Sequence, residues 1–173
     1  ASHLNERYMN TSGPLIKSRL LTAAEVHFVI AEAALKGWTS ENSETHYEDG
    51  VQASLKAWGL SGDYASYILN TGVFYEGSLE QIMEQKWIAS WTAAAEAWFD
   101  YRRTGWPALQ PGSIVKRDAL PLRFYYSVDE MDYNPDNTQL AIDLLETTIF
   151  SAEDGENSAW SKMWVLQGTG KPW

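Results

Sequence analysis

Residues 78–103 read SLEQIMEQKWIASWTAAAEAWFDYRR, the longest run of helical periodicity in the chain. Ser78 can cap the start of a helix, with Gln81 in the matching position three residues later, and Gly105 and Pro107 follow the end. Apolar residues recur about every 3.7 positions along one side, the spacing of a core-facing helix surface. They are Leu79, Met83, Trp87, Trp91, Ala94, Trp98 and Tyr101. Because other apolar residues lie elsewhere around the helix, we expect one long rod, ending near Arg103 and enclosed by its neighbours.

Another helix is expected to begin at Thr22, whose hydroxyl can cap it together with Glu25, and to end at Lys36 before Gly37. Its core-facing residues, at helical spacing, are expected to be Val26, Val29, Ile30 and Ala33.

The next helix is expected from Glu44 to Ala57, with Gly59 as its stop signal. Its apolar side carries Tyr47, Val51, Leu55 and Trp58. The pair resembles one tetratricopeptide repeat in length, and small residues permit its helices to cross closely. These are Ala31, Ala34, Gly50 and Ala53. The predicted fold class is mainly α, with tetratricopeptide-like helix pairs around a long central helix, irregular loops and at most a short hairpin.

We expect a single domain over residues 1–173, with an arm at 1–20, a helical core at 21–107, and loops, a short helix and an aromatic tail at 108–173. Residues 60–77 read as loops around a short helix near 64–69. Beyond the core, 114–115 and 120–126 are candidates for extended structure, and 137–146 for a helix. Trp160, Trp164 and Trp173 are expected to pack back onto the helices.

The composition excludes several classes of protein. The net charge of −10 argues against a nucleic-acid surface, and the absence of cysteine excludes disulfides and thiolate metal sites. No hydrophobic run reaches the roughly 20 residues that span a bilayer, and residues 1–14 lack the layout of a signal peptide. Nine Trp and nine Tyr are more than a core of this size requires, so some rings are expected to bind a ligand.

Glu96 and Asp100 stand four residues apart, which places both carboxylates on one side of a helix. A glycosidase needs such a pair, one carboxyl as acid and the other as base or nucleophile. Arg102 and Arg103 follow within a turn, however, and structural ion pairing is the favoured interpretation.

His3, His27 and His46 are scattered without the close spacing of metal ligands, so no metal site is expected. The acidic stretch at 129–137 lacks the alternating ligands of a calcium loop and is expected to be a solvated turn. Neither a nucleophile elbow nor a phosphate-binding glycine loop is present, and no cofactor is expected.

Four segments occur in a distinctive order: LTAAEVHFVIAEAA at 21–34, EQKWIA at 84–89, EAWFDYRRTGWP at 96–107, and LPLRFYY at 120–126 followed by Asn134 and Asn137. Together they resemble the carboxy-terminal part of the SusD/RagB family of nutrient-binding outer-membrane lipoproteins. The chain departs from the family pattern at Tyr126-Ser127, where tyrosine-proline is expected, and around Trp164, where paired tryptophans are usual.

The resemblance implies a helical protein that captures glycans or other nutrients at the cell surface and is not an enzyme. It also implies a SusC-like TonB-dependent outer-membrane transporter as partner and an amino-terminal lipid anchor as the contact with the membrane. Because the chain has no cysteine, that anchor and further repeat helices are expected on an upstream segment.

Within this chain, the predicted ligand-binding residues are Trp38, Tyr64, Tyr67 and Tyr75, because they lie in loop-rich segments or just beyond a helix end. Packing into the core is the alternative for each ring. Two other functions stay open at this point: a helical scaffold for a protein partner, and a glycosidase that uses Glu96 and Asp100.

Overall fold

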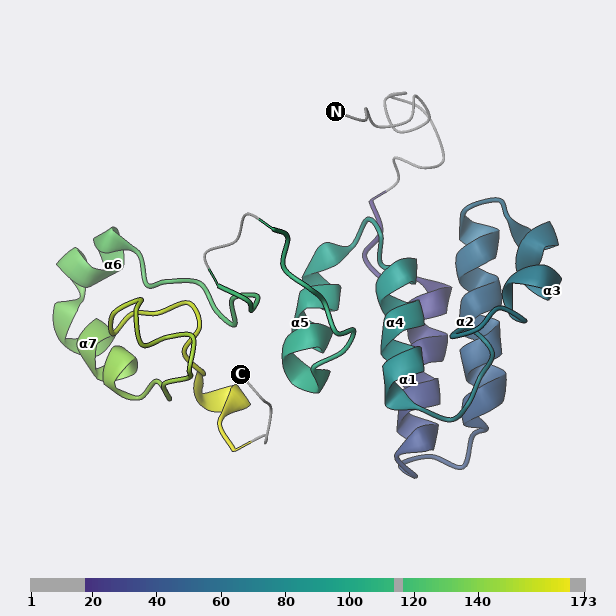
Figure 1. Cartoon of the computed structure of the whole chain (residues 1–173), viewed down its shortest axis with the longest axis horizontal. Helices are drawn as coiled ribbons and strands as arrows, with labels where there is room; N and C mark the ends of the chain where they lie inside the picture. The colour runs from purple at the N-terminus through teal and green to yellow at the C-terminus, as the bar shows by residue number, and fades with distance from the viewer. Residues whose placement is uncertain (1–17, 114–116, 169–173) are drawn as a thin grey trace, which may run out of the picture. The chain divides into compact units, whose positions relative to one another are not determined.

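The structure is a computed structural model that describes residues 18–113 and 117–168. These residues form seven α-helices and two short 3₁₀ helices, in agreement with the predicted helical class (Figure 1). The chain divides into two compact units, residues 1–101 and residues 102–173, which are described separately below. Among the described residues, no helix is long and apolar enough to cross a bilayer.

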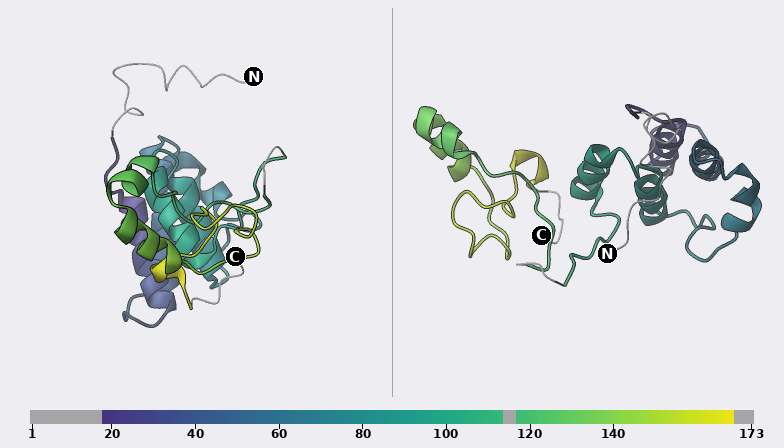
Figure 2. Two further views of the ribbon diagram at one scale, coloured as in Figure 1. Left: turned by 90° about the vertical axis from the view of Figure 1, so that its left-hand side faces the viewer. Right: turned by 90° about the horizontal axis from the view of Figure 1, so that it is seen from above.

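Three helices form the body of unit 1: α1 (Ala23–Leu35), α2 (Ser43–Ala57) and α4 (Leu79–Ala89). One view of Figure 2 looks nearly along their axes and shows them side by side. The predicted start of α1 is confirmed, because the Thr22 hydroxyl accepts a hydrogen bond from the Glu25 amide at 3.1 Å. Its predicted end is also confirmed, with Lys36 as the cap and Gly37 at a φ of 70°.

The α1–α2 contact is built on two aromatic side chains and a glycine. Phe28 and Tyr47 are fully buried, and their ring centroids lie 6.1 Å apart in an edge-to-face arrangement. A Cβ atom on Gly50 would stand 2.8 Å from the Phe28 ring, so the close crossing requires glycine there. The predicted role of small residues in the crossing is confirmed at Gly50.

The predicted core face of α1 is wrong. The buried residues of the helix are Ala24, Phe28, Ala31 and Glu32. By contrast, Val26 is 40% exposed and Val29 is 49% exposed. α1 is apolar on more than one side, and α2 and α4 cover only the side that carries Phe28. Apolar periodicity therefore located a helix surface but did not identify the surface that these neighbours bury.

The predicted rod over 78–103 is two helices, α4 and α5 (Ala94–Thr104), separated by a turn at 90–93 (Figure 1). The Ser90 hydroxyl donates to the Lys86 carbonyl at 2.7 Å, and the Ala93 amide donates to the Ser90 carbonyl at 2.7 Å. The Ser90 amide still donates to the Lys86 carbonyl at 3.0 Å, and the helix ends there, at a residue type whose hydroxyl competes for backbone groups. The rod is not enclosed by the described residues either, since Trp87 is 43% and Trp91 is 62% exposed.

Between α2 and α4 the chain forms a 3₁₀ turn, η3 (Ser61–Asp63), and the short helix α3 (Tyr64–Tyr67) near its predicted position. Tyr47 of α2 anchors this connection, because its hydroxyl donates to the Val73 carbonyl at 2.6 Å. Burial raises the pKa of Tyr47, as expected for a phenol committed to such a bond.

Unit 2 is irregular. Its helices are short: α6 (Val128–Tyr133), α7 (Pro135–Asp143) and η4 (Trp164–Leu166). The acidic stretch expected as a turn instead begins with α6, which Ser127 caps, and continues into α7, which starts at Pro135. The predicted helix at 137–146 corresponds to α7, displaced by two or three residues at its ends.

Extended structure is scarce in unit 2. The described residues contain one isolated bridge, between Glu146 and Lys162, whose side chains also form an ion pair at 2.9 Å. The expected extended segment at 120–126 is a loop, held where the Leu122 and Arg123 amides donate to the Ala159 carbonyl. The candidate at 114–115 lies outside the described residues.

The tryptophans of the tail behave differently from one another. Trp160 packs back into unit 2, but on loop residues and not on the expected helices: its indole nitrogen donates to the Ala119 carbonyl at 2.8 Å and its ring stacks on Arg117. Trp164, however, is 84% exposed, so its predicted packing is wrong within the described part of the chain. Trp173 lies outside the described residues.

Candidate functional site

Trp38 is the most accessible of the four predicted ligand-binding residues. It follows the Gly37 turn that ends α1, and 74% of its surface is exposed. The Lys36 ammonium lies 4.8 Å from the centroid of the Trp38 ring, a cation–π contact that holds the indole against the end of the helix. A flat, exposed and oriented ring is the kind of surface on which a sugar can stack.

Tyr67 and Tyr75 are engaged in the fold of unit 1. The Tyr67 hydroxyl donates to the Gln85 side-chain oxygen at 3.1 Å. The Tyr75 hydroxyl shares a short hydrogen bond with the Ser43 hydroxyl, and its ring lies 4.8 Å from the Tyr47 ring. Both residues are half-buried.

Tyr64 begins α3 and lies beside the middle of α2. Burial, and then the negative charges of Glu48 and Asp49, raise the pKa of the Tyr64 hydroxyl. The Ser43 contact places Tyr75 at the start of α2 instead. Tyr64 and Tyr75 therefore lie beside different parts of α2, whereas Tyr67 bonds to Gln85 of α4. The role of the three tyrosines in ligand binding stays a prediction.

The carboxylates on α5 do not form the arrangement of a glycosidase. Asp100 is held in an ion pair with Lys86 of α4, at 2.6 Å, with 7% of the Lys86 side chain and 14% of the Asp100 side chain exposed. The carboxylate of Asp100 is therefore engaged in a largely buried ion pair that joins α4 to α5. Glu96 is exposed one turn earlier on the helix. Structural ion pairing, the favoured interpretation of Glu96 and Asp100, is confirmed for Asp100 with Lys86 as a partner, and stays a prediction for Glu96.

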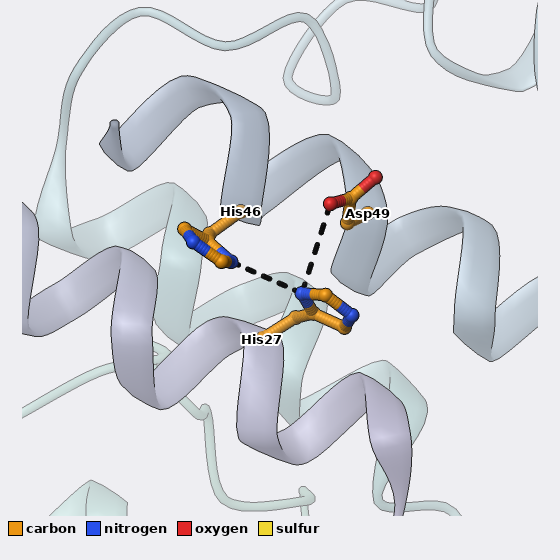
Figure 3. A group of neighbouring side chains, drawn as sticks. All are labelled: His27, His46 and Asp49. Carbon is orange, nitrogen blue, oxygen red and sulfur yellow. Dashed lines mark hydrogen bonds and ion pairs between the residues drawn. The ribbon is translucent and has the colours of Figure 1, made fainter. Parts of the chain in front are cut away.

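The histidines were expected to lie apart, and for two of them this is wrong. His27 on α1 and His46 on α2 approach to 3.1 Å between their Nδ1 atoms, and the Asp49 carboxylate lies 3.8 Å from His27 Nδ1 (Figure 3). His3 lies outside the described residues. The cluster borders a hollow of about 480 Å³. It is lined by His27, Asp49, Gln52, Ala53, Lys56 and Ser61.

The sequence holds only part of a signal for this proximity. In an antiparallel pair, the residues of the two helices lie opposite each other in reverse order. Which residues meet depends on the stagger of α2 along α1, seen where the Ser43 hydroxyl donates to the Ala31 carbonyl at 2.8 Å. The connection at 36–42 is centred two residues beyond Gly37, so distance from the turn alone does not pair His27 with His46.

The chain was compared with known proteins. Residues 1–127 match the family model SusD-like_2, described as starch-binding and associating with the outer membrane. No curated protein matches the chain.

Solved structures give the same class. A Bacteroidetes SusD-like protein is similar to this chain at 32% identity and a TM-score of 0.71, over 88% of this chain and 32% of its own length. A SusD homologue from Bacteroides fragilis is 26% identical, with a TM-score of 0.65, over 83% of this chain and 34% of that one. A chitin-binding protein is 29% identical, with a TM-score of 0.63, over 82% and 32%.

These structures and the helix pairs of unit 1 define a helical protein of the SusD type. The family match over residues 1–127 covers well over half of the chain, which therefore belongs to the SusD-like family. The family consists of nutrient-binding proteins rather than enzymes, in agreement with the expected absence of catalysis. The chain spans about a third of the length of the solved relatives it matches.

Proposed function

We propose that this chain is the carboxy-terminal part of a surface-exposed outer-membrane lipoprotein that binds carbohydrate or a related nutrient without transforming it. The observation that carries the proposal is the match to a starch-binding family over residues 1–127. A chitin-binding protein among the structural relatives supports a glycan as the ligand. The ligand would pass to a SusC-like TonB-dependent transporter, as the family resemblance implies.

Trp38 is the side chain of this chain best suited to contact such a ligand. Its indole is exposed, and the Lys36 ammonium holds it in one orientation, so stacking on a sugar would cost little side-chain entropy. Tyr67 and Tyr75 would contribute less, because they are half-buried and their hydroxyls already bond to Gln85 and Ser43.

The test is titration of the protein with a panel of soluble oligosaccharides, including starch and chitin fragments, by isothermal calorimetry. At least one glycan should bind, and Trp38→Ala should weaken that binding about tenfold, the effect of losing about 1.4 kcal/mol of stacking. Trp164→Ala is the matched control, because Trp164 is 84% exposed but lies in unit 2. Absence of binding to every glycan, or an equal loss in both variants, would contradict the proposal.

A scaffold that binds a protein partner is the second candidate function. Its support is the apolar side of α1, where Val26 and Val29 stand one turn apart and are 40% and 49% exposed. The experiment is co-purification of the protein with its transporter. An association that survives removal of all four predicted rings, and is lost in Val26→Asp/Val29→Asp, would favour the scaffold over glycan capture.

A further inference from the structure

We propose that His27, His46 and Asp49 form a binding site for a divalent transition-metal ion of the Zn²⁺ class. All three residues lie in unit 1, on the facing sides of α1 and α2 (Figure 3). His46 and Asp49 are three residues apart on α2 and therefore project from the same side of that helix. His27 reaches them from α1, so the ion would cross-link α1 and α2.

The distances between the ligand atoms suit such an ion. Zn²⁺ binds nitrogen and oxygen ligands at about 2.0–2.2 Å, which puts two ligands of one tetrahedral ion about 3.3 Å apart. The two Nδ1 atoms are 3.1 Å apart, and His27 Nδ1 is 3.8 Å from Asp49 Oδ2. All three ligand atoms lie within 4.8 Å of one another, so small rotations of the side chains would complete the site.

Hydrogen bonding alone does not account for the whole cluster. Two imidazoles at 3.1 Å can share one proton, as an ordinary donor and acceptor pair. Asp49, however, lies 3.8 Å from the same nitrogen, beyond hydrogen-bond range. A shared proton links only the two imidazole nitrogens. A metal ion between the three groups would bind both nitrogens and the Asp49 carboxylate together.

A second observation points to a metal independently of the three ligands. The other nitrogen of His46, Nε2, lies 3.4 Å from the Glu41 carboxylate. A histidine that binds a metal through one ring nitrogen characteristically donates its other N–H to a carboxylate, which orients the ring and increases its basicity. Glu41 stands in that position, just before α2, with His46 between it and the proposed ion.

The cluster also leaves room for a fourth ligand. Three protein ligands with one open position are typical of zinc sites that accept water or a bound molecule. His27 and Asp49 both line the hollow of about 480 Å³, into which that position would open. Lys56 lines the same hollow, so an anionic molecule bound to the ion there would have a cationic residue beside it.

The test uses the whole chain after treatment with a chelator, titrated with Zn²⁺ by calorimetry and with Co²⁺ by visible absorption. We expect one ion per chain and the intense visible bands of tetrahedral Co²⁺. His27→Ala and His46→Ala should each weaken binding by at least about 100-fold, and Glu41→Gln by about 10- to 100-fold. His3→Ala is the matched control, as the third histidine of the chain, and should leave the affinity unchanged.

Circular dichroism of each variant would show whether the helices persist, and Asp49→Asn supplies a nearly isosteric ligand change if a histidine variant fails to fold. Unchanged Zn²⁺ affinity in folded His27→Ala or Asp49→Asn protein would overturn the proposal, as would an equal loss in His3→Ala. The measurement needs no glycan, so its result is independent of the carbohydrate-binding proposal.

Discussion

The two units of the chain are held together by different kinds of interaction. In unit 1, helices pack through buried apolar side chains such as Phe28 and Ile82, with a few buried polar groups such as Gln85 beside them. In unit 2, the helices have at most nine residues, and the loops are organised by charged and hydroxyl side chains, of which Arg123 and Ser158 are buried. Helices can pack wherever apolar side chains recur at helical spacing. The loops of unit 2 are held by individual hydrogen bonds, each between one specific side chain and one specific backbone group.

Asp154 is one centre of unit 2. Its Oδ2 atom accepts hydrogen bonds from the Tyr125 hydroxyl at 2.8 Å, the Ser158 hydroxyl at 2.9 Å and the Ala159 amide at 3.3 Å. Arg117 lies 3.3 Å from the other oxygen of the same carboxylate. One short side chain thereby fixes the loop at 154–159 to two other segments.

Arg123 is the other centre. Only 5% exposed, it donates to the Ser158 carbonyl at 2.8 Å and to the Asn157 side-chain oxygen at 3.0 Å. Asn157 in turn bonds both the amide and the carbonyl of Tyr126, each at 3.0 Å. Side-chain hydrogen bonds therefore hold the segment around Arg123 against the loop that carries Asn157. In a β-sheet, backbone hydrogen bonds would do this.

The largest difference between the units should appear when an arginine is removed from each. Arg123→Ala should destabilise unit 2 by about 3 kcal/mol, because it removes two hydrogen bonds from a charged group, and the one to the Ser158 carbonyl is buried. Arg19→Ala is the matched change in unit 1. Arg19 stacks at 4.2 Å on Trp58 near the surface, so its loss should cost about 0.5–1 kcal/mol.

Amide hydrogen exchange, read separately over 119–162 and over α1 and α2, would measure both arginine variants. Equal loss of protection in the two units would break the comparison, because it would mean that the polar contacts of unit 2 carry no special weight.

A smaller effect is expected where the helices of unit 1 cross. Gly50→Ala improves helix propensity by about 1 kcal/mol, but the new methyl group would meet the fully buried Phe28 ring at 2.8 Å. Overpacking of this kind costs about 1–3 kcal/mol, so we expect net destabilisation of about 1 kcal/mol.

Urea denaturation followed by circular dichroism at the helical band would measure the Gly50 variant. Gly62→Ala is its control, since no atom lies within 4 Å of the added carbon there. A Gly50→Ala protein more stable than the original would show that the helix pair can separate without loss.

The smallest effect is expected from pH. Burial alone would raise the pKa of Asp154, but hydrogen bonds from Tyr125, Ser158 and the Ala159 amide, together with the charge of Arg117, outweigh it and lower the pKa. A lowered folded-state pKa adds stability above the unfolded value of 3.8, and that stability is lost as pH falls below it.

Protection factors over 154–161 should therefore fall between pH 5 and pH 3 by more than those of α1. Asp136→Asn, at an exposed position on α7, should not change this pH dependence, whereas Asp154→Asn should remove it. A pH response that persists in Asp154→Asn would assign the acid sensitivity to other carboxyls.

The part of the fold that the sequence predicted is the part that periodicity and capping control. Thr22, Gly37 and Ser78 marked helix ends correctly, because a cap is a local interaction between neighbours in the chain. The interruption at Ser90 was missed, since its signal is one hydroxyl turning back on the helix within a run of good apolar spacing. The contacts of Arg123 join residues more than thirty positions apart, and no local pattern encodes them.

The candidate sites show the same limit. Loop position suggested Tyr67 and Tyr75 as binding residues, but the hydroxyls of both are used within the fold by partners 18 and 32 residues away. Separation along the chain gives no indication that His27 and His46 meet. The predicted antiparallel pair puts them on neighbouring helices, but the stagger of α2 along α1 that brings them together is set by the fold.

The outward valines of α1 bear on how this chain behaves in water. Val26 and Val29 form an exposed apolar surface that favours association between molecules, while the net charge of −10 makes the molecules repel one another. Added salt weakens only the charge repulsion, because the Debye screening length is about 10 Å at 0.1 M, and it leaves the apolar attraction intact. The colloidal stability of the chain thus depends on ionic strength. A partner that buried Val26 and Val29 would remove this dependence.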